Sequence, residues 1–355
     1  MYVKRVAVQD FRNYEYGEVD FINGTNVICG PNARGKTNIL ESIFLFATSK
    51  SHRGARESDL IRKEAEFAKI KISFFARGRE NVGEININKK KQFRINKVPI
   101  VKTSDLMGCL NVVMFCPEDL RVIKGAPRER RRFLDIGISQ IRSGYFHKLI
   151  EYNKILDQRN ALLRTGMEDT WVWDEQFAKT GARVAWYRKN YILELEKYAK
   201  EHMKNIGNEE ISIKYINEKE TEEDYRLDIL AGLEKNKERE KRWKQTLYGP
   251  HRDDFIIEIN KLDIRHFASQ GQIRTTVIAL KLAEADIIKK ETGETPILLL
   301  DDALSELDEE RQKYILKKFG GAQVIITCTN AEKFEGVRVI KVDDIRRVGV
   351  SCIYT

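Results

Sequence analysis

Cysteine and proline are scarce in this chain, which has 355 residues, five cysteines and six prolines. The cysteines are odd in number and form neither a CxxC pair nor another zinc-binding spacing: they are Cys29, Cys109, Cys116, Cys328 and Cys352. A set this sparse excludes a disulfide-stapled fold and argues against a metal site built on cysteine. We expect reduced thiols in a cytoplasmic protein.

Long apolar runs are missing as well. No stretch approaches the roughly 20 apolar residues that a membrane-spanning helix needs, and the N-terminus lacks the apolar core of a secretion signal. Charged residues make up 33% of the chain and hydrophobic residues 42%, which is enough to build a sizeable core. The sequence therefore predicts a folded protein that does not associate with a membrane.

Positive charge exceeds negative charge, and the excess is concentrated in one part of the chain. The 63 lysines and arginines outnumber the 54 aspartates and glutamates by nine. Residues 50–102 contain 15 basic and 6 acidic residues, so this segment alone carries a net charge of +9. Such a local excess attracts polyanions and favours binding to nucleic acid. A solvated sheet surface is the alternative, because lysine and arginine are common on edge strands.

Hydrophobic periodicity predicts strands and helices at both ends of the chain. In the first hundred residues, apolar and alternating runs predict one helix at 37–46 and strands at 3–8, 25–29, 69–75, 84–88 and 92–95. The last hundred residues return to this mixed pattern. They contain a predicted helix at 270–289 and apolar strands at 297–300 and 324–327.

The middle of the chain has a different texture. Residues 117–247 carry apolar residues at helical spacing among many charges, and no proline occurs there after Pro127. We therefore predict an α/β fold, with a mixed sheet that has an antiparallel part, split by a helical lobe of about 130 residues. The predicted boundaries are 1–115 for the first half of the α/β unit, 116–246 for the lobe and 247–355 for the second half.

A phosphate-binding loop is predicted at residues 30–37. The segment GPNARGKT fits the pattern G-x-x-x-x-G-K-[ST], and it lies between a predicted buried strand and a helix. Its glycines let backbone N–H groups surround phosphate oxygens, Lys36 supplies a positive charge, and the Thr37 hydroxyl is a ligand for Mg²⁺. The predicted nucleotide contacts are Gly30, Pro31, Asn32, Ala33, Arg34, Gly35, Lys36, Thr37 and Asn38. The alternative is a glycine turn with an incidental lysine.

An apolar run ends in paired carboxylates at residues 297–302. Ligands of open α/β sheets bind beyond the carboxyl ends of the strands, so both side chains are expected near the phosphates. Asp301 is predicted to hold Mg²⁺, directly or through water, and Asp302 to orient or deprotonate the attacking water. A strand followed by an N-cap aspartate is the alternative.

A second anion-binding helix end is predicted shortly before this strand. The segment SQGQ, residues 269–272, precedes a helix, and Ser269 and Gly271 lie at its N-terminus. The alternative is a local helix cap without a ligand.

These features occur in the order found in SMC-like and ABC-type ATPases: phosphate loop, helical insertion, SQGQ and LLLDD. Further segments resemble the RecF family of DNA replication and repair proteins along the whole chain. They are FRNY at 11–14, GPNA at 30–33, SHR at 51–53, PEDL at 117–120, GAPR at 125–128, RRFLD at 131–135 and GPHRDD at 249–254.

The resemblance implies an ABC-type ATPase head in which a compact helical lobe replaces a long coiled coil. It implies ATP and Mg²⁺ as cofactors, with ATP held between two copies of the chain in a homodimer. In that dimer Ser269, Gly271 and Gln272 of one copy contact the nucleotide on the phosphate loop of the other, and residues 304–308 lie along the seam. It also implies binding to duplex, gapped or single-stranded DNA, action with RecO and RecR in recombinational repair, and a weak DNA-stimulated ATPase activity.

Three departures from the ATPase pattern set further expectations. Asp302 follows the metal-binding aspartate where a glutamate is usual, and its shorter side chain predicts slow turnover. Thr329 is the candidate sensor where ABC transporters use a histidine. Glu118 and Asp119 stand where many heads carry a glutamine, which leaves a metal contact there open.

Other polar residues keep two interpretations. Arg12 and Asn13 either contact the adenine or ribose or form a polar turn. His251 and Arg252 either contact phosphate or build the subunit interface, and His251 can instead be a packed histidine in a turn. The basic run 128–132 either binds DNA or forms a solvated helix face.

Three alternative functions remain open. An SMC-type head would need a long heptad coiled coil, which about 130 residues in several helices cannot supply at 1.5 Å per residue. An ATPase subunit of a membrane transporter would lack DNA affinity, and the basic excess argues against it. A small-molecule kinase would transfer phosphate to a substrate, whereas the serine–glycine signature predicts hydrolysis alone.

Overall fold

The computed structural model of the chain describes residues 1–166, 171–303, 308–330 and 336–346. They form two compact units. Unit 1 consists of residues 1–119 and 284–355, and unit 2 of residues 120–283, so unit 2 interrupts unit 1 in sequence. The lobe predicted at residues 116–246 remains a prediction. Residues 304–307, expected at a dimer seam, lie outside the described residues, as does Cys352.

A five-stranded parallel sheet forms the core of unit 1. Its strand order is β14 (Arg338–Lys341), β3 (Thr25–Cys29), β13 (Val324–Cys328), β12 (Ile297–Asp301) and β8 (Val112–Phe115). All five residues of β12 are buried, which is typical of a parallel strand covered on both faces. Because the strands are parallel, β3, β13 and β12 end side by side at one edge. Helix α1 (Lys36–Thr48) begins just beyond the end of β3.

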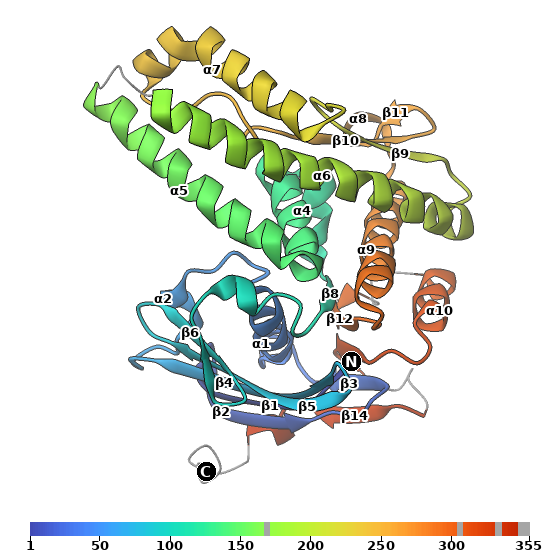
Figure 1. Cartoon of the computed structure of the whole chain (residues 1–355). Coiled ribbons are helices and arrows are strands. Elements are labelled where there is room, and N and C mark those ends of the chain that lie inside the picture. The colour runs from blue at the N-terminus through green and yellow to red at the C-terminus, as the bar shows by residue number, and fades with distance from the viewer. Residues whose placement is uncertain (167–170, 304–307, 331–335, 347–355) are drawn as a thin grey trace. The chain divides into compact units, whose positions relative to one another are not determined.

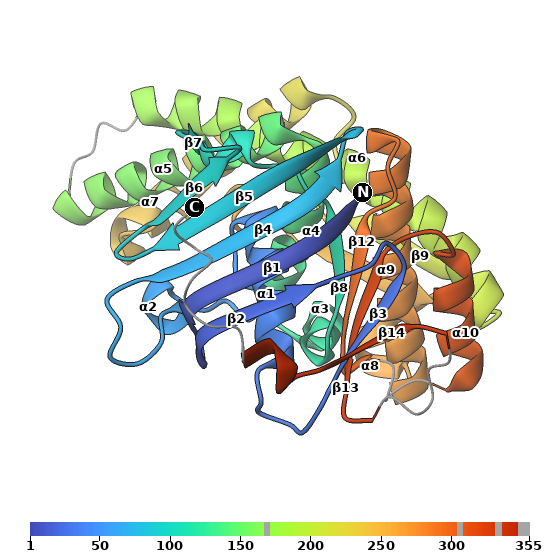
Figure 2. The ribbon, with the colours of Figure 1, turned by 90° about the horizontal axis from the view of Figure 1, so that it is seen from below.

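The second sheet of unit 1 is antiparallel and has six strands. Its order is β2 (Tyr14–Asp20), β1 (Tyr2–Phe11), β4 (Ala68–Ala76), β5 (Arg79–Ile87), β6 (Lys91–Ile95) and β7 (Val98–Ile100) (Figure 2). Side chains along β4 alternate between buried and partly exposed, as expected when one face of the sheet lies in the core. Phe46 of α1 packs against Phe74 of β4, with 5.6 Å between the ring centroids. Helix α1 therefore covers this sheet and also contacts β12 and β13.

Short elements complete unit 1. They are helices α2 (Glu57–Leu60) and α10 (Glu309–Lys318) and the 3-10 helices η1 (Thr103–Asp105) and η4 (Asp344–Arg346).

Unit 2 is mainly helical. Its long helices α5 (Ser143–Thr165), α6 (Trp171–Ile206) and α7 (Glu222–Trp243) lie side by side (Figure 1). The 3-10 helix η2 (Pro117–Leu120) leads into α3 (Arg121–Lys124) and α4 (Pro127–Ile141). A small antiparallel sheet has the order β11 (Leu262–Asp263), β10 (Phe255–Ile259) and β9 (Ile211–Tyr215), and it is followed by α8 (Ile264–Phe267). Helix α9 (Gln270–Thr292) begins in unit 2 and ends in unit 1.

The predicted α/β class and the predicted strands and helices of unit 1 are confirmed. The segment 117–247, predicted as a helical lobe, also contains a strand that was not predicted, β9 at Ile211–Tyr215. Its sequence ISIKY alternates between apolar and polar residues and pairs with β10, so packing against a partner strand outweighs the helical surroundings. The sequence also did not predict β2, β7, β8 or β14. In the described part of the chain, no helix combines the length and apolarity needed to span a membrane.

The GPHRDD segment packs against the rest of unit 2 through His251, Asp253 and Asp254, whereas Arg252 is exposed. Nδ1 of His251 lies 2.7 Å from the Tyr152 hydroxyl, and Nε2 lies 3.1 Å from the carbonyl oxygen of Thr246. Burial lowers the pKa of His251 to about 4, so the ring is neutral at physiological pH. These contacts support the interpretation of His251 as a packed histidine in a turn.

Two arginines of the basic run 128–132 hold the same segment. Arg130 is 3% exposed and pairs with Asp254 through two bonds, Nε–Oδ1 at 2.6 Å and Nη2–Oδ2 at 2.8 Å. Arg131 donates to the carbonyl oxygen of Asp253 at 2.7 Å, and burial lowers the pKa of Arg131. Neither predicted role of the run, DNA contact or solvated face, therefore applies to Arg130. The side chain of Arg128 is 84% exposed and does face solvent.

The closest approach of α1 to the antiparallel sheet gives a stability prediction. A Cβ added to Gly83 of β5 would lie 2.2 Å from Cζ of Phe46, whose ring is fully buried. We expect Gly83→Ala to destabilise the protein by about 1–3 kcal/mol, because the core must shift to admit the methyl group. Calorimetry should show this as a lower melting temperature.

A matched control is Gly144→Ala in the first turn of α5. There the added Cβ would lie 3.8 Å from the Tyr187 hydroxyl, which is ordinary contact, and alanine favours a helix. This variant should melt no lower than the parent. If Gly83→Ala also melts like the parent, the close packing of Phe46 on β5 is wrong.

Candidate functional site

The loop between β3 and α1 requires glycine at both ends. Gly30 has a φ of +151° and Gly35 a φ of +103°, values that residues with side chains rarely adopt. A Cβ at Gly30 would come within 2.4 Å of Val342, and one at Gly35 within 2.8 Å of Tyr14. Ala33, between them, also has a positive φ of +61°. The backbone is thus folded tightly enough for its N–H groups to surround an anion.

Lys36 turns its ammonium group back under this loop. The residue is 4% exposed, and Nζ donates to the carbonyl oxygens of Gly30 at 2.7 Å and Pro31 at 3.1 Å. A third, longer bond reaches Oδ1 of Asn32 at 3.4 Å. These contacts fix the positive charge at the N-terminus of α1, where it adds to the helix dipole in attracting an anion.

Thr37 and Asp301 meet although 264 positions separate them in sequence. The Thr37 hydroxyl donates to Oδ1 of Asp301 at 2.7 Å, and the Thr327 hydroxyl donates to the same oxygen at 2.8 Å. The backbone N–H of Asp302 donates in turn to Oγ1 of Thr327 at 3.0 Å. A hydroxyl and a carboxylate held side by side are oxygen ligands of the kind that Mg²⁺ prefers, so Thr37 and Asp301 fit the predicted metal.

Burial dominates the electrostatics of Asp301. The residue is 5% exposed, and burial raises the pKa of its carboxyl group above the ordinary value. The hydrogen bonds from Thr37 and Thr327 oppose this shift, whereas the neighbouring charge of Asp302 adds to it. A cation at this position would favour the ionised carboxylate, because opposite charge lowers a carboxyl pKa.

A cavity of about 290 Å³ opens at the loop. It is lined by Asn13, Asn32, Ala33, Gly35, Lys36, Thr37, Asn38, Arg53 and Asp302. The structure therefore brings predicted residues of the phosphate loop and of the acidic strand end into one cavity. Arg53, which belongs to the SHR segment and had no predicted role, adds a positive charge to the lining.

Sequence reasoning missed the contact made by Thr327. It proposed Thr329 as the candidate sensor, but Thr329 is exposed, and Thr327 holds Asp301. The parallel register pairs Asp301 directly with Thr327. A polar residue at the end of the apolar run 324–327 was therefore the available signal, since neighbouring parallel strands end at one edge.

Arg12 forms a salt bridge with a buried carboxylate of unit 1. Its Nε and Nη2 donate to Oε2 and Oε1 of Glu41 at 2.8 and 2.7 Å, and its Nη1 donates to the carbonyl oxygen of Asp59 at 2.8 Å. Glu41 is fully buried and also accepts a bond from Ser51 at 2.5 Å. Burial acts to raise the pKa of Glu41, but the bonds from Arg12 and Ser51 outweigh it, so the pKa lies below its ordinary value. The polar-turn interpretation accounts for Arg12, and a nucleotide contact stays a prediction.

The remaining candidates of unit 1 lie around the cavity and at the junction with unit 2. Nδ2 of Asn38 donates to Oδ1 of Asn13 at 2.8 Å, and both residues line the cavity. Oδ2 of Asp119 accepts from the backbone N–H of Cys116 at 2.8 Å. Burial lowers the pKa of His52 to about 4, and the charge of Glu118 opposes that shift. A metal contact from Glu118 or Asp119 stays a prediction.

The serine–glycine signature begins α9 in unit 2. The N–H of Ser269 donates to Oε1 of Gln272 at 2.7 Å, and the N–H of Gln272 donates to Oγ of Ser269 at 3.2 Å, which is a capping box. Nε2 of Gln272 also lies 2.5 Å from Oε1 of Glu209. Ser269 and Gly271 are exposed. The signature is thus an exposed helix N-terminus with its own cap, and its contact with a nucleotide stays a prediction.

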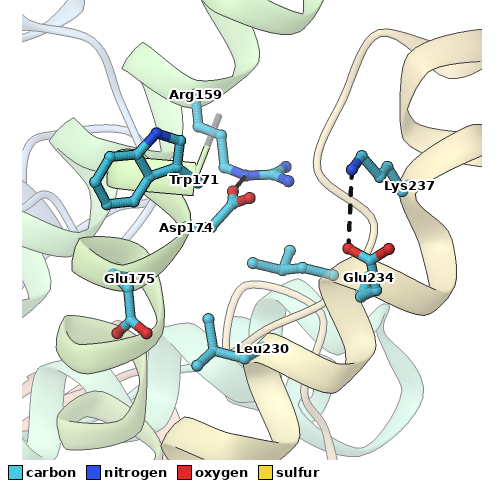
Figure 3. A pocket seen from close by; sticks show the side chains of 8 residues that line it. Arg159, Trp171, Asp174, Glu175, Leu230, Glu234 and Lys237 are labelled. Atoms are coloured by element: carbon cyan, nitrogen blue, oxygen red, sulfur yellow. Dashed lines mark hydrogen bonds and ion pairs between the residues drawn. The ribbon is translucent and has the colours of Figure 1, made fainter. Parts of the chain in front are cut away.

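Unit 2 contains a larger cavity, of about 340 Å³ (Figure 3). It is lined by Arg159, Trp171, Asp174, Glu175, Leu230, Leu233, Glu234 and Lys237. Arg159 lies 2.7 Å from both Asp174 and Glu240, and Glu175 lies 3.0 Å from Arg226. These charged side chains pair with one another inside unit 2, and no residue predicted to hold nucleotide lines this cavity.

Comparison with known proteins assigns this fold to a class. Residues 2–348 match the family described as RecF/RecN/SMC N terminal domain. An SMC head solved with the C-winged helix domain of ScpA has the same fold, with a TM-score of 0.52 at 17% identity over 94% of this chain and 91% of that chain. The fold is therefore that of an SMC-like, ABC-type ATPase head.

More similar relatives define the family within that class. The chain is 43% identical over 343 residues to the DNA replication and repair protein RecF of Clostridium acetobutylicum. The aligned region covers 94% of each of the two chains. RecF of Clostridium botulinum (strain Okra / Type B1) is also 43% identical, with the same coverage. A solved structure described as the recombination mediator protein RecF with ATP in the RecFOR pathway has a TM-score of 0.91 at 37% identity, over 96% of this chain and 95% of that chain. The chain belongs to the RecF family of DNA replication and repair proteins.

The pair between Arg12 and Glu41 gives a stability prediction with a defined pH dependence. Arg12→Ala leaves the buried Glu41 carboxylate without its guanidinium, and we expect a loss of about 3 kcal/mol at pH 7, measured by denaturant unfolding. In the parent, the lowered pKa of Glu41 stabilises the fold above pH 4.5, and this contribution is lost as the pH falls through the folded-state pKa. In the variant, burial without the pair raises the pKa. As the pH falls, the deficit of the variant should therefore begin to shrink above pH 4.5, at the raised pKa of the variant, and continue to shrink until the pH passes the lowered pKa of the parent.

The matched control is Arg5→Ala, which removes an exposed arginine from its pairs with Asp20 and Glu18. That change should cost less than about 1 kcal/mol, because solvent screens exposed ion pairs. A deficit of Arg12→Ala that stays constant into acid would mean that ionisation of Glu41 is not its cause.

Proposed function

We propose that the chain is an ATP-dependent DNA-binding protein of recombinational repair. Two copies close on shared ATP, clamp duplex or gapped DNA and, with RecO and RecR, help load recombinase on single-stranded gaps. ATP hydrolysis is slow and is stimulated by DNA. The observation that carries this proposal is the convergence of Lys36, Thr37 and Asp302 on one cavity beside a loop bounded by glycines.

The nucleotide would be held by the loop residues 30–38. Lys36 brings a fixed positive charge to the phosphates, and the N-terminus of α1 adds its dipole. Thr37 and Asp301 would hold Mg²⁺, which supplies charge neutralisation for the phosphates. Related RecF proteins have been solved with ATP and with an ATP analogue, which supports ATP as the nucleotide.

Asp302 is the candidate for orienting the attacking water. It lines the cavity, and its backbone is fixed by the bond to Thr327. Its φ of +49° is a left-handed conformation that a short polar side chain such as aspartate tolerates. An aspartate reaches less far than a glutamate, and this supports slow turnover.

The exposed signature supports a second copy as its partner. Ser269 and Gly271 are exposed at the helix N-terminus, where Oγ of Ser269 accepts only one bond, from the N–H of Gln272. The side chain of Gln272 is held by both Ser269 and Glu209. Ser269 and Gly271 are therefore the stronger candidates for contact in trans. If ATP touches both copies, it binds the dimer more tightly than the monomer, and so shifts the population toward the dimer.

DNA binding is supported by positive charge and by similarity to named relatives. The segment 50–102 carries a net charge of +9, and relatives are named as DNA replication and repair proteins or placed in the RecFOR pathway. The proposal of RecO and RecR as partners rests on similarity to these relatives alone. The cytoplasmic location stays a prediction. A long projecting coiled coil has no support in the described residues, since α6, with 36 residues, packs against α5 and α7.

Nucleotide-dependent dimerisation is the first test. With Mg²⁺ and a nonhydrolysable ATP analogue, sedimentation velocity should show the parent shifting from monomer to dimer. Lys36→Met should lose nucleotide binding and stay monomeric. Ser269→Arg should keep nucleotide binding but dimerise at least tenfold more weakly, because its bulk and charge block the helix end.

Ser143→Arg is the matched control, since Ser143 is an exposed serine at the start of another helix of unit 2, α5. It should dimerise like the parent. An unchanged sedimenting mass of the parent at saturating nucleotide would refute the ATP-bridged dimer.

Turnover is the second test. We expect the parent, with duplex DNA present, to hydrolyse ATP below about 1 s⁻¹, slower than typical kinases. Asp302→Asn should lower the single-turnover rate about 100-fold or more, the usual contribution of a positioned acid–base group, while ATP affinity stays unchanged. A parent rate within the kinase range, or full activity of Asp302→Asn, would count against the assigned role of Asp302.

A further inference from the structure

A strongly basic hairpin forms one edge of the antiparallel sheet. We define the basic hairpin as residues 88–102, which comprise the turn after β5, strand β6, the following turn, strand β7 and the two residues after it. It contains no acidic residue, and its basic residues are Lys89, Lys90, Lys91, Arg94, Lys97 and Lys102. In the strand order, β7 is the last strand, at the opposite edge from β2 (Figure 2).

The hairpin is a rigid platform. Asn96 and Lys97 have φ values of +52° and +70°, and this two-residue turn matches the twist of the paired strands. The turn is pinned to the sheet, because Oδ1 of Asn96 accepts from the N–H of Val82 at 2.9 Å and the N–H of Asn96 donates to the carbonyl oxygen of Val82 at 2.8 Å. Phe93 is 5% exposed and anchors β6 in the core.

Most of the positive charges on this platform are not neutralised by the chain. Five of the six are exposed and lie in no ion pair of the described residues: Lys89, Lys90, Arg94, Lys97 and Lys102. Lys91 is the exception, since its Nζ lies 3.1 Å from Oε1 of Glu57. Glu84 is the cross-strand neighbour of Arg94 and weakens the positive field there.

We infer that the basic hairpin binds the sugar–phosphate backbone of duplex DNA, an inference that rests on the proposed function and assigns it a surface. Strand β6, from Lys91 to Ile95, is about 13 Å long at 3.3 Å per residue, which corresponds to about four base pairs of B-DNA, and Lys90 and Lys97 flank it. Lysines spaced over that length follow a strand of phosphates, and they contact it without reading the bases.

The hairpin is a poor docking edge for a protein strand. Strand β7 has only three residues, and Pro99 at its centre has no N–H to donate to an added strand. Lysine and proline on an edge strand also protect a sheet from aggregation. This protection would explain the basic residues without any bound ligand. The experiment must therefore separate phosphate contact from edge protection.

The test measures binding of the full chain to a short DNA duplex by fluorescence anisotropy across a salt series, with Mg²⁺ and a nonhydrolysable ATP analogue. The variant carries Lys89→Gln, Lys90→Gln and Lys97→Gln. We expect its affinity to fall about tenfold or more, and the slope of log K against log salt to fall by about 2 to 3, close to 0.9 for each phosphate contact.

The control variant makes the same change in charge elsewhere in unit 1. It carries Lys289→Gln, Lys313→Gln and Lys317→Gln, all exposed and outside the basic segment 50–102. Its affinity and salt slope should match those of the parent. ATP-dependent dimerisation is measured in parallel and should be unchanged in both variants.

The outcomes are distinguishable. If the parent binds DNA and the hairpin variant keeps the parental affinity and slope, the assignment is overturned and the proposed function stands. If the variant aggregates but binds DNA like the parent, the hairpin protects the sheet edge. If it loses RecR binding but binds DNA like the parent, the hairpin contacts a protein partner. Either result would also overturn the DNA assignment. Failure of the parent to bind DNA at low salt would overturn both proposals.

Discussion

The two hydrogen bonds that Asp301 accepts from Thr37 and Thr327 are the contacts on which the rest of unit 1 depends. They join the start of α1 to the end of β12, and so they tie together two sequence segments that unit 2 separates. The register of β12 against β13 and of β13 against β3 places these groups within reach. A slip of one residue would turn the Asp301 side chain to the other face of the sheet, so folding and the candidate site share one constraint.

An insertion as long as unit 2 is compatible with this arrangement. The entropic cost of closing a loop grows only with the logarithm of its length, and unit 2 forms a core of its own. Helix α9 continues from the signature into unit 1, and Ser269 is the residue that caps its start. Its first turn contains no acidic residue, whereas α7 begins with three. The N-terminus of α9 is capped by Ser269 and Gln272 and carries no acidic residue of its own in the first turn.

Local patterns predicted the parts of the site that lie within one segment. The phosphate loop follows from glycine and lysine spacing, and the acidic strand end from an apolar run that stops at Asp301. The roles of Thr327, Arg53 and Glu41 depend on which segments become neighbours, and a single sequence does not state the strand register. Strand β9 was not predicted for a related reason. Its alternation of apolar and polar residues is short, and the strand is stabilised by pairing with β10.

The basic hairpin and the nucleotide cavity belong to opposite edges of the antiparallel sheet. Asn13, which lines the cavity, precedes β2 at one edge, and Lys97 lies between β6 and β7 at the other. Nucleotide can control DNA binding over that separation without any change of shape inside unit 1. One hairpin offers a few lysine contacts, and such binding weakens steeply as salt rises. If ATP holds two copies together as proposed, two hairpins are joined, and linked sites raise the apparent affinity for one polyanion without adding a new type of contact. Hydrolysis would end that linkage, so release of DNA would follow from loss of the dimer rather than from damage to any single contact.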